Sequence, residues 1–98
     1  MEISYNIYKQ GDDVLLAACD SELLGKKFCE GEITLDVKES FYSGKEGTSS
    51  ELCKNFKEAT IANLIGEKTI DTAISDGFGG EEDILWVDGI PHLQIVRM

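Results

Sequence analysis

The chain has 98 residues and a net charge of −10, with nineteen acidic and nine basic residues. A chain of this length buries one core, and its 27 Ile, Leu, Val and Phe residues are enough to fold it, so we expect a single domain spanning residues 1–98. The acidic excess repels phosphate backbones and anionic lipid, which argues against DNA and against a membrane surface as partners.

Strand patterns occupy the first part of the chain. Residues 2–9 alternate apolar and polar side chains, and residues 14–19 are apolar on both faces. We therefore expect two strands joined by a turn, with the second strand in the core. Asp20 is expected to accept hydrogen bonds from the amides of the short turn that follows it. Residues 32–38 alternate again and predict a third strand with one face in water.

Helical spacing follows a polar loop. Residues 43–50 predict a mobile loop, whose last hydroxyl residues cap a helix that runs to Gly66. One face of this predicted helix is formed by residues three or four positions apart, namely Leu52, Phe56, Ala59 and Asn63. Residues 67–76 predict a second helix, which Gly77 ends. We therefore expect two helices in tandem.

The last elements predict a hairpin. An acidic loop over residues 79–83 leads into a strand at 84–87, and Asp88 and Gly89 turn the chain into a strand at 93–96. In the order βββααββ, the elements predict an α+β fold with a largely antiparallel sheet of about five strands and the two helices packed on one face. A split sheet is the alternative arrangement.

The cysteines and the apolar segments bear on the cellular compartment. Cys19, Cys29 and Cys53 are too widely spaced for a zinc knuckle or a redox motif. Because their number is odd, at least one cannot join an internal disulfide, and we expect free, mostly buried thiols. The start of the chain lacks a signal-peptide pattern, and no apolar run approaches the roughly 20 residues that cross a bilayer, which predicts a cytoplasmic protein.

The sequence offers little for catalysis. His92 is the only histidine, and no cysteine lies in a glycine-flanked strand-to-helix turn that would expose a nucleophile. The scattered carboxylates lack the spacing of zinc or calcium ligands. We therefore expect no catalytic residue, no metal and no cofactor. Trp86 could stack on a base, but aromatic strand residues are more often in the core, where we expect it.

Asn63 requires a partner in any folded structure. On the apolar face of a helix, an unpaired side-chain amide costs about 1–3 kcal/mol. One interpretation is a buried structural hydrogen bond to a neighbouring strand or helix end. The other is a polar group that lines a shallow pocket with His92 and Gln94.

Three segments are informative in combination, at residues 13–25, 59–66 and 89–95. They contain DVLLAACD followed by LLG, then ATIANLIG, and GIPHLQI. Together they resemble an archaeal family, the domain of unknown function 424, and the similarity runs from end to end. The resemblance implies an archaeal cytoplasmic protein with no established activity, loosely labelled as RNA-binding or translation-associated. It brings no catalytic residue, and it matches Asn63, His92 and Gln94 to positions in its motifs.

We interpret the chain as a noncatalytic cytoplasmic interaction module, and the resemblance suggests association with the translation machinery. The predicted binding patch consists of Asn63, His92, Gln94 and Arg97. The acidic charge favours a protein partner with a basic surface. One alternative is an RNA-binding protein that gathers four lysines on one side, Lys26, Lys27, Lys54 and Lys57. Another is a small-molecule or peptide binder with a pocket near Asn63 and His92. An enzyme is the least favoured interpretation.

Overall fold

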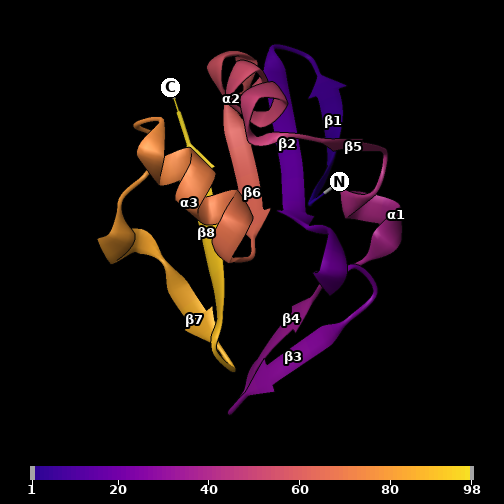
Figure 1. The fold of residues 1–98 in the computed structure, drawn as a ribbon, viewed down its shortest axis with the longest axis vertical. Coiled ribbons are helices and arrows are strands. Elements are labelled where there is room, and N and C mark those ends of the chain that lie inside the picture. Colours follow the sequence, from indigo (N-terminus) through magenta and orange to yellow (C-terminus); the bar gives the residue numbers. More distant parts are fainter. Residues whose placement is uncertain (1, 98) are drawn as a thin grey trace.

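The computed structural model describes residues 2–97, which form a six-stranded sheet, a separate two-stranded hairpin and three α-helices (Figure 1). The strands are β1 (Ile3–Gln10), β2 (Asp13–Asp20), β3 (Lys27–Glu30), β4 (Ile33–Asp36), β5 (Lys45–Gly47), β6 (Ile61–Ile65), β7 (Leu85–Val87) and β8 (Ile90–Val96). The helices are α1 (Glu39–Tyr42), α2 (Ser49–Glu58) and α3 (Glu67–Ser75), with short 3₁₀ turns η1 (Ser21–Leu23) and η2 (Glu81–Asp83).

The main sheet has the strand order β5-β1-β2-β6-β8-β7. Its neighbouring strands are antiparallel, except that β2 and β6 run parallel at the centre. The α+β class and the mostly antiparallel sheet are therefore confirmed. The predicted sheet of about five strands is too small and lacks the parallel pair, which requires a long crossover connection between its strands. That crossover contains the β3-β4 hairpin, α1, β5 and α2.

The spacing predicted that the helix continues to Gly66, but the segment after α2 is a strand. α2 ends at Glu58, and residues 61–65 form β6 between β2 and β8. The predicted order βββααββ is wrong for the same reason, because β6 separates the two helices. The apolar residues that suggested a helix buried on several sides lie instead on the two faces of a central strand. A short apolar run does not separate these two cases by periodicity alone.

Part of the predicted loop at residues 43–50 is also a strand. β5 pairs with β1 through Lys45, Glu46 and Gly47, so this part of the segment is held at the edge of the sheet. Mobility of the rest of the loop stays a prediction. The predicted strand at 32–38 is confirmed in its centre as β4, and it pairs with β3, which the sequence pattern did not reveal.

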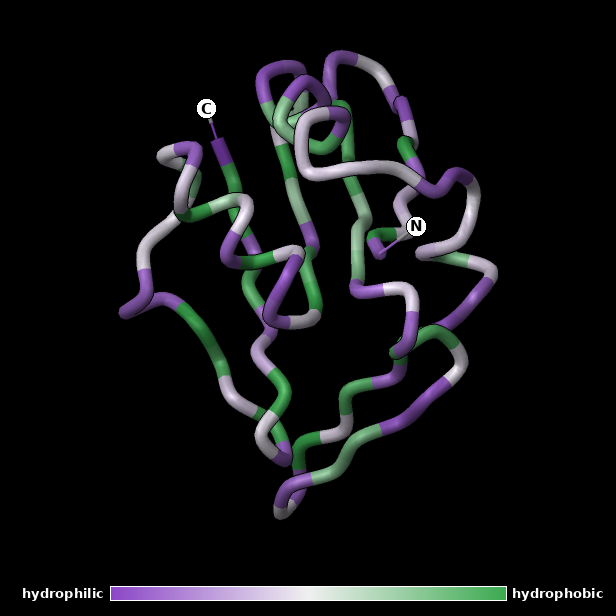
Figure 2. Tube along the Cα trace, in the orientation of Figure 1, coloured by the Kyte–Doolittle hydropathy of each residue, from purple (hydrophilic) through white to green (hydrophobic). Residues whose placement is uncertain are grey.

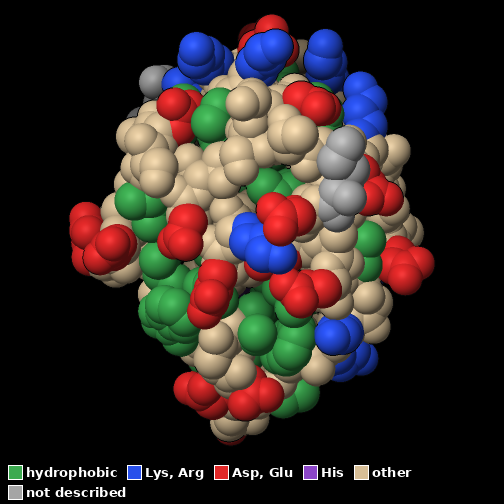
Figure 3. Space-filling view, viewed as in Figure 1, with side chains coloured by type: hydrophobic (Ala, Val, Ile, Leu, Met, Phe, Trp, Pro, Cys, Tyr) green, Lys and Arg blue, Asp and Glu red, His purple; other side chains and the backbone are tan. Residues whose placement is uncertain are grey.

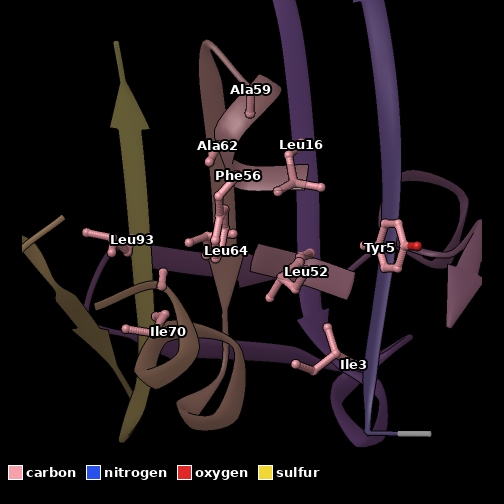
Figure 4. Packing of buried hydrophobic residues seen from close by; sticks show 12 residues of the cluster. Ile3, Tyr5, Leu16, Leu52, Phe56, Ala59, Ala62, Leu64, Ile70 and Leu93 are labelled. Carbon is pink, nitrogen blue, oxygen red and sulfur yellow. The ribbon is translucent and has the colours of Figure 1, made fainter. Parts of the chain in front are cut away.

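α2 and α3 cover one face of the main sheet. Leu52 and Phe56 of α2 and Ile70 of α3 belong to the core that packs on this face. Figure 4 shows these side chains between the helices and the strands, and Figure 2 shows how apolar residues concentrate along the central strands. Thr48 caps α2 by accepting a hydrogen bond from the Glu51 amide at 3.3 Å. The two predicted helices thus share one face, as expected.

The opposite face of the sheet carries a second core, so the expectation of one core is wrong. Successive residues of a strand point to opposite faces, which places Ala17 and Cys19 of β2 on this side. Tyr42 of α1 packs over them, together with Leu35 and Val37 from the β3-β4 hairpin and the segment after it. The hairpin and α1 therefore cover this second face in place of long helices.

Asp20 connects two elements instead of capping its own turn. Its carboxylate accepts hydrogen bonds from the backbone amides of Lys68 and Thr69, at 3.2 and 2.9 Å, and from the Thr69 hydroxyl at 2.9 Å. The expectation for the following turn is wrong, since η1 has no side-chain cap. The free amides at the start of α3 give a buried carboxylate more hydrogen-bond partners than the short turn η1 does. Gly66 permits the contact, because a Cβ there would lie 2.4 Å from the Asp20 carboxyl carbon.

α3 ends as the sequence predicted. The helix stops at Ser75, and Gly77 adopts a φ of +84°, a backbone conformation that favours glycine. Within residues 2–97, no helix has the length and the apolar content needed to cross a membrane.

Candidate functional site

Asn63 and His92 meet on the sheet face that α1 covers. Asn63 lies in β6 and His92 in β8, and the His92 Nε2 is 2.8 Å from the Asn63 Oδ1. Tyr42 donates its hydroxyl to the same oxygen at 3.1 Å. Because a carbonyl oxygen only accepts hydrogen bonds, the arrangement assigns the imidazole proton to Nε2. Asn63 thus reaches His92 from a strand, and the predicted helical setting of Asn63 is wrong.

Gln94 lies beside this pair, whereas Arg97 does not. The register of β6 and β8 places Gln94 directly opposite Asn63, and opposite residues on antiparallel strands point to the same face. The Arg97 guanidinium donates to the Phe56 carbonyl at 2.6 Å and lies over the Phe78 ring, 4.6 Å from its centroid. Phe56 belongs to the core beneath α2 and α3, and Phe78 is partly buried against that core. The sheet therefore separates Arg97 from the other members of the predicted patch.

Burial keeps this polar cluster uncharged. It lowers the pKa of His92 below the usual value of 6.5, so the imidazole is neutral at pH 7. Burial, together with the charge of Asp20, raises the pKa of the Cys19 thiol to about 12. Burial also raises the pKa of Tyr42. A thiol with so high a pKa is not a nucleophile at neutral pH. The cluster can exchange hydrogen bonds with a ligand, but it lacks an ionised nucleophile.

Several carboxylates are engaged in the fold. Asp13 accepts a hydrogen bond from the Thr60 hydroxyl at 3.2 Å, and Glu30 accepts one from the Asp88 amide at 2.8 Å. Among residues 2–97, no group of His, Cys, Asp and Glu side chains is arranged to hold a metal ion.

A groove opens between α3 and β7, on the sheet face that carries the two longer helices. Its volume is about 440 Å³, which lies in the range of ligand sites. Five apolar residues line it, namely Ile70, Ile74, Ile84, Trp86 and Pro91. The remaining lining residues are three acids, here called the groove carboxylates, Glu67, Asp71 and Glu81. Trp86, which we expected in the core, is 51% exposed. It lies on the edge strand β7, which ends the sheet.

The groove is negatively charged, and none of the described residues that line it is basic. Within residues 2–97, the ion pairs are those of Lys68 with Glu2 at 3.4 Å and with Glu22 at 3.7 Å. None of the groove carboxylates therefore has a basic partner in that part of the chain. Figure 3 shows hydrophobic side chains at the surface near α3 and β7, with acidic side chains around them.

Sequence reasoning did not identify this groove. It expected Trp86 in the core, and it considered the carboxylates only as metal ligands. One signal was available in the predicted hairpin at residues 84–96. A hairpin joined to a sheet by one strand leaves the other strand at the edge, where a neighbouring helix covers a large side chain only in part.

Comparisons with known proteins agree with the resemblance seen in the sequence. The family described as Protein of unknown function (DUF424) matches residues 8–98. The crystal structure of an uncharacterized conserved protein from the archaeon Methanopyrus kandleri is also similar, with 32% identity and a TM-score of 0.82. The match covers 98% of this chain and 93% of that chain. Among curated proteins, no sequence matches this chain.

Proposed function

Because the chain belongs to the DUF424 family of proteins of unknown function, we propose a role from its geometry. It is a noncatalytic interaction module that binds a protein partner with a basic surface through the groove between α3 and β7. One observation carries this proposal: a groove lined by apolar side chains also holds three carboxylates, and these lack a basic partner among residues 2–97. A basic segment that contains apolar residues complements both properties.

The setting of the reactive side chains supports a noncatalytic role. Cys19 is fully buried with a raised pKa, and His92 is hydrogen bonded to Asn63. The Asn63 oxygen accepts two hydrogen bonds from different elements. We assign these residues mainly to holding α1 and β8 against β6.

A small-molecule or peptide site near Asn63 and His92 is the second candidate. Among residues 2–97, the Asn63 amide nitrogen and the His92 Nδ1 make no hydrogen bond, and neither atom is buried without a partner. Gln94 is exposed beside them. A ligand with one donor and one acceptor would satisfy these groups.

The lysines favour a protein partner over RNA. Lys54 and Lys57 lie in α2 at one end of the molecule, whereas Lys27 lies in β3 at the other end, with Lys26 next to it (Figure 1). RNA binding through one face that joins the four would require them on the same side. We propose a cytoplasmic partner, and basic proteins of the translation machinery, which the resemblance suggested, are the first to test.

Site-specific photo-crosslinking tests the proposal. A photoreactive residue replaces Glu82, next to the groove residue Glu81, and a control version carries it at Glu46 on the opposite edge strand. We expect the Glu82 version to crosslink one partner through a segment rich in lysine or arginine. Asp71→Lys should abolish this crosslink, and the purified partner should reproduce the binding.

A different result would reject the groove as the binding surface. If the partner crosslinks from Glu46 instead, or if Asp71→Lys leaves its binding unchanged, the partner binds elsewhere. The crosslinking is done in cell extract. Treating this extract with nuclease distinguishes a direct protein contact from one that RNA bridges.

A further inference from the structure

Trp86 is the single tryptophan of the chain, and its side chain is half exposed in the groove between α3 and β7. In the hairpin of β7 and β8 it lies opposite Pro91, which is buried. Both residues point to the face that α3 covers. The indole thus presents an open aromatic surface next to the groove carboxylates.

The chain already holds one cation on an aromatic ring. Arg97 lies 4.6 Å from the centroid of Phe78 and is fixed by its hydrogen bond to the Phe56 carbonyl. Among residues 2–97, no basic side chain lies over Trp86 in the same way. Lys68, on the first turn of α3, is paired with Glu2 and Glu22 outside the groove. No cation of residues 2–97 therefore occupies the aromatic and acidic groups of the groove, which leaves them accessible to a cation from another molecule.

We propose that the groove holds a lysine or arginine side chain of a partner protein, with its charged end between Trp86 and the groove carboxylates. This inference rests on the proposed function and names the chemistry that the partner brings to the groove. Indole is the aromatic ring that attracts cations most strongly. Long basic side chains lay their aliphatic stems along apolar surfaces while the charge reaches polar groups. Ile74 and Ile84, which line the groove and are half-buried, provide such a surface.

Charge complementarity selects a basic protein segment over other occupants. A second copy of this chain brings a net charge of −10, so the two molecules repel each other. The phosphates of a nucleic acid would meet the groove carboxylates, which have the same sign. The apolar lining also favours a segment in which apolar residues flank the cation, because these residues leave water on binding.

Intrinsic fluorescence provides a direct measurement, since Trp86 is the only indole in the protein. The probe is a short end-blocked peptide of alternating lysine and leucine, and a second peptide has arginine in place of lysine. Matched peptides carry glutamine or glutamate at the same positions. Spermidine tests whether a free aliphatic cation is enough. We expect the lysine and arginine peptides to shift the Trp86 emission in a saturable way, and the glutamine and glutamate peptides to leave it unchanged.

Variants separate the aromatic and the acidic contributions. Asp71→Asn with Glu81→Gln should weaken binding of the basic peptides about tenfold, which is the size of a favourable cation–π or charged contact. Trp86→Leu keeps an apolar side chain and should weaken binding similarly, as measured by calorimetry. Glu46→Gln, on the opposite edge of the sheet, is the control for charge and should have no effect.

The outcomes distinguish this inference from the proposed function. If the glutamine peptide binds as tightly as the lysine peptide, or if the acid variants keep full affinity, the cation site is rejected. The proposed function survives that result when Trp86→Leu still weakens binding of the partner identified by crosslinking. It fails as well when neither Trp86→Leu nor Asp71→Lys affects that partner. If spermidine binds with the same affinity as the peptides, a small polyamine is a sufficient ligand for the groove, and the inference of a protein segment is also overturned.

Discussion

Asn63 is an acceptor on which two parts of the chain converge. Its Oδ1 receives hydrogen bonds from Tyr42 in α1 and from His92 in β8. We expect Asn63→Ala to lower the free energy of unfolding by about 1–3 kcal/mol, because two partly buried donors lose their acceptor. Tyr42→Phe removes one donor and leaves the other bond intact, so it should cost about 0.5–1.5 kcal/mol.

Chemical denaturation of the two single variants and of the double variant measures the coupling. The double variant should be more stable than the sum of the single effects predicts, because Asn63→Ala already removes the bond of Tyr42. If the two changes in the free energy of unfolding are strictly additive, the stabilisation by the Tyr42 hydroxyl does not depend on Asn63. Gln94→Ala is the control, since Gln94 is exposed on the same face.

His92 links the stability of the fold to pH. Burial lowers its folded-state pKa below 6.5, so the unfolded chain binds a proton more readily than the folded one. The contribution of the neutral imidazole is therefore complete above pH 6.5 and is lost as the pH falls from 6.5 through the lowered pKa. We expect the free energy of unfolding to decrease over this window, as measured by denaturant titrations at successive pH values.

The matched variant for this prediction is His92→Gln. Glutamine offers a donor to Asn63 but has no proton to gain in this range. The wild-type protein should lose more stability than His92→Gln between pH 7.5 and 5.5. Equal losses in the two proteins would assign the pH dependence to carboxylates.

At the scale of elements, the sequence was most informative where local signals and tertiary contacts agree. The β1-β2 hairpin, α3 and the last hairpin follow their patterns because turn residues and periodicity agree there, although β8 begins at Ile90, earlier than the predicted start at 93. β6 fails this test. Its residues continue the spacing of α2, and only its pairing with β2 and β8 makes it a strand. Such pairings join distant segments, which a local pattern does not contain.

The candidate site was also predicted only where local patterns were sufficient. The sequence brought Asn63, His92 and Gln94 into one patch, although Asn63 was placed on the wrong element. Arg97 was misplaced, because successive residues near the end of a strand point to opposite faces. The groove depends on the packing of α3 beside the edge strand β7, which is a tertiary property. Trp86 therefore looked like a core residue in the sequence.

The start of α3 depends on Asp20 from another element. Its carboxylate accepts from the Lys68 and Thr69 amides and from the Thr69 hydroxyl. Asp20→Ala should therefore lower the free energy of unfolding by about 0.5–2 kcal/mol, the range for a lost helix cap. Asp12→Ala, in an exposed turn, is the control and should change stability by less than about 0.5 kcal/mol. An Asp20→Ala protein as stable as the control would show that water replaces the carboxylate at these amides.

For the whole molecule, two cores share one sheet, and the described structure contains free thiols at Cys19, Cys29 and Cys53. We expect cooperative unfolding that needs neither a disulfide nor a metal. A thermal melt with a reductant and a chelator should therefore coincide with the melt in buffer alone. A lower melting temperature in either additive would reveal a crosslink or a bound ion that contributes to stability.

The distribution of charge over the whole molecule decides between a basic protein and RNA as the partner. In Figure 3 most of the visible lysine and arginine side chains lie at the end that carries α2, while acidic side chains are scattered over the rest of this face. When RNA binds through basic residues, the logarithm of the binding constant falls linearly with the logarithm of the salt concentration. The slope is set by the number of phosphates neutralised. We expect weak binding of ribosomal RNA fragments at physiological salt, measured by fluorescence anisotropy. Lys54→Glu with Lys57→Glu should abolish any residual binding at low salt, whereas Lys26→Glu with Lys27→Glu, at the opposite end, should leave it unchanged. Tight, salt-sensitive binding that requires both pairs of lysines would show that RNA spans the molecule, and it would favour the RNA-binding alternative over the basic protein partner.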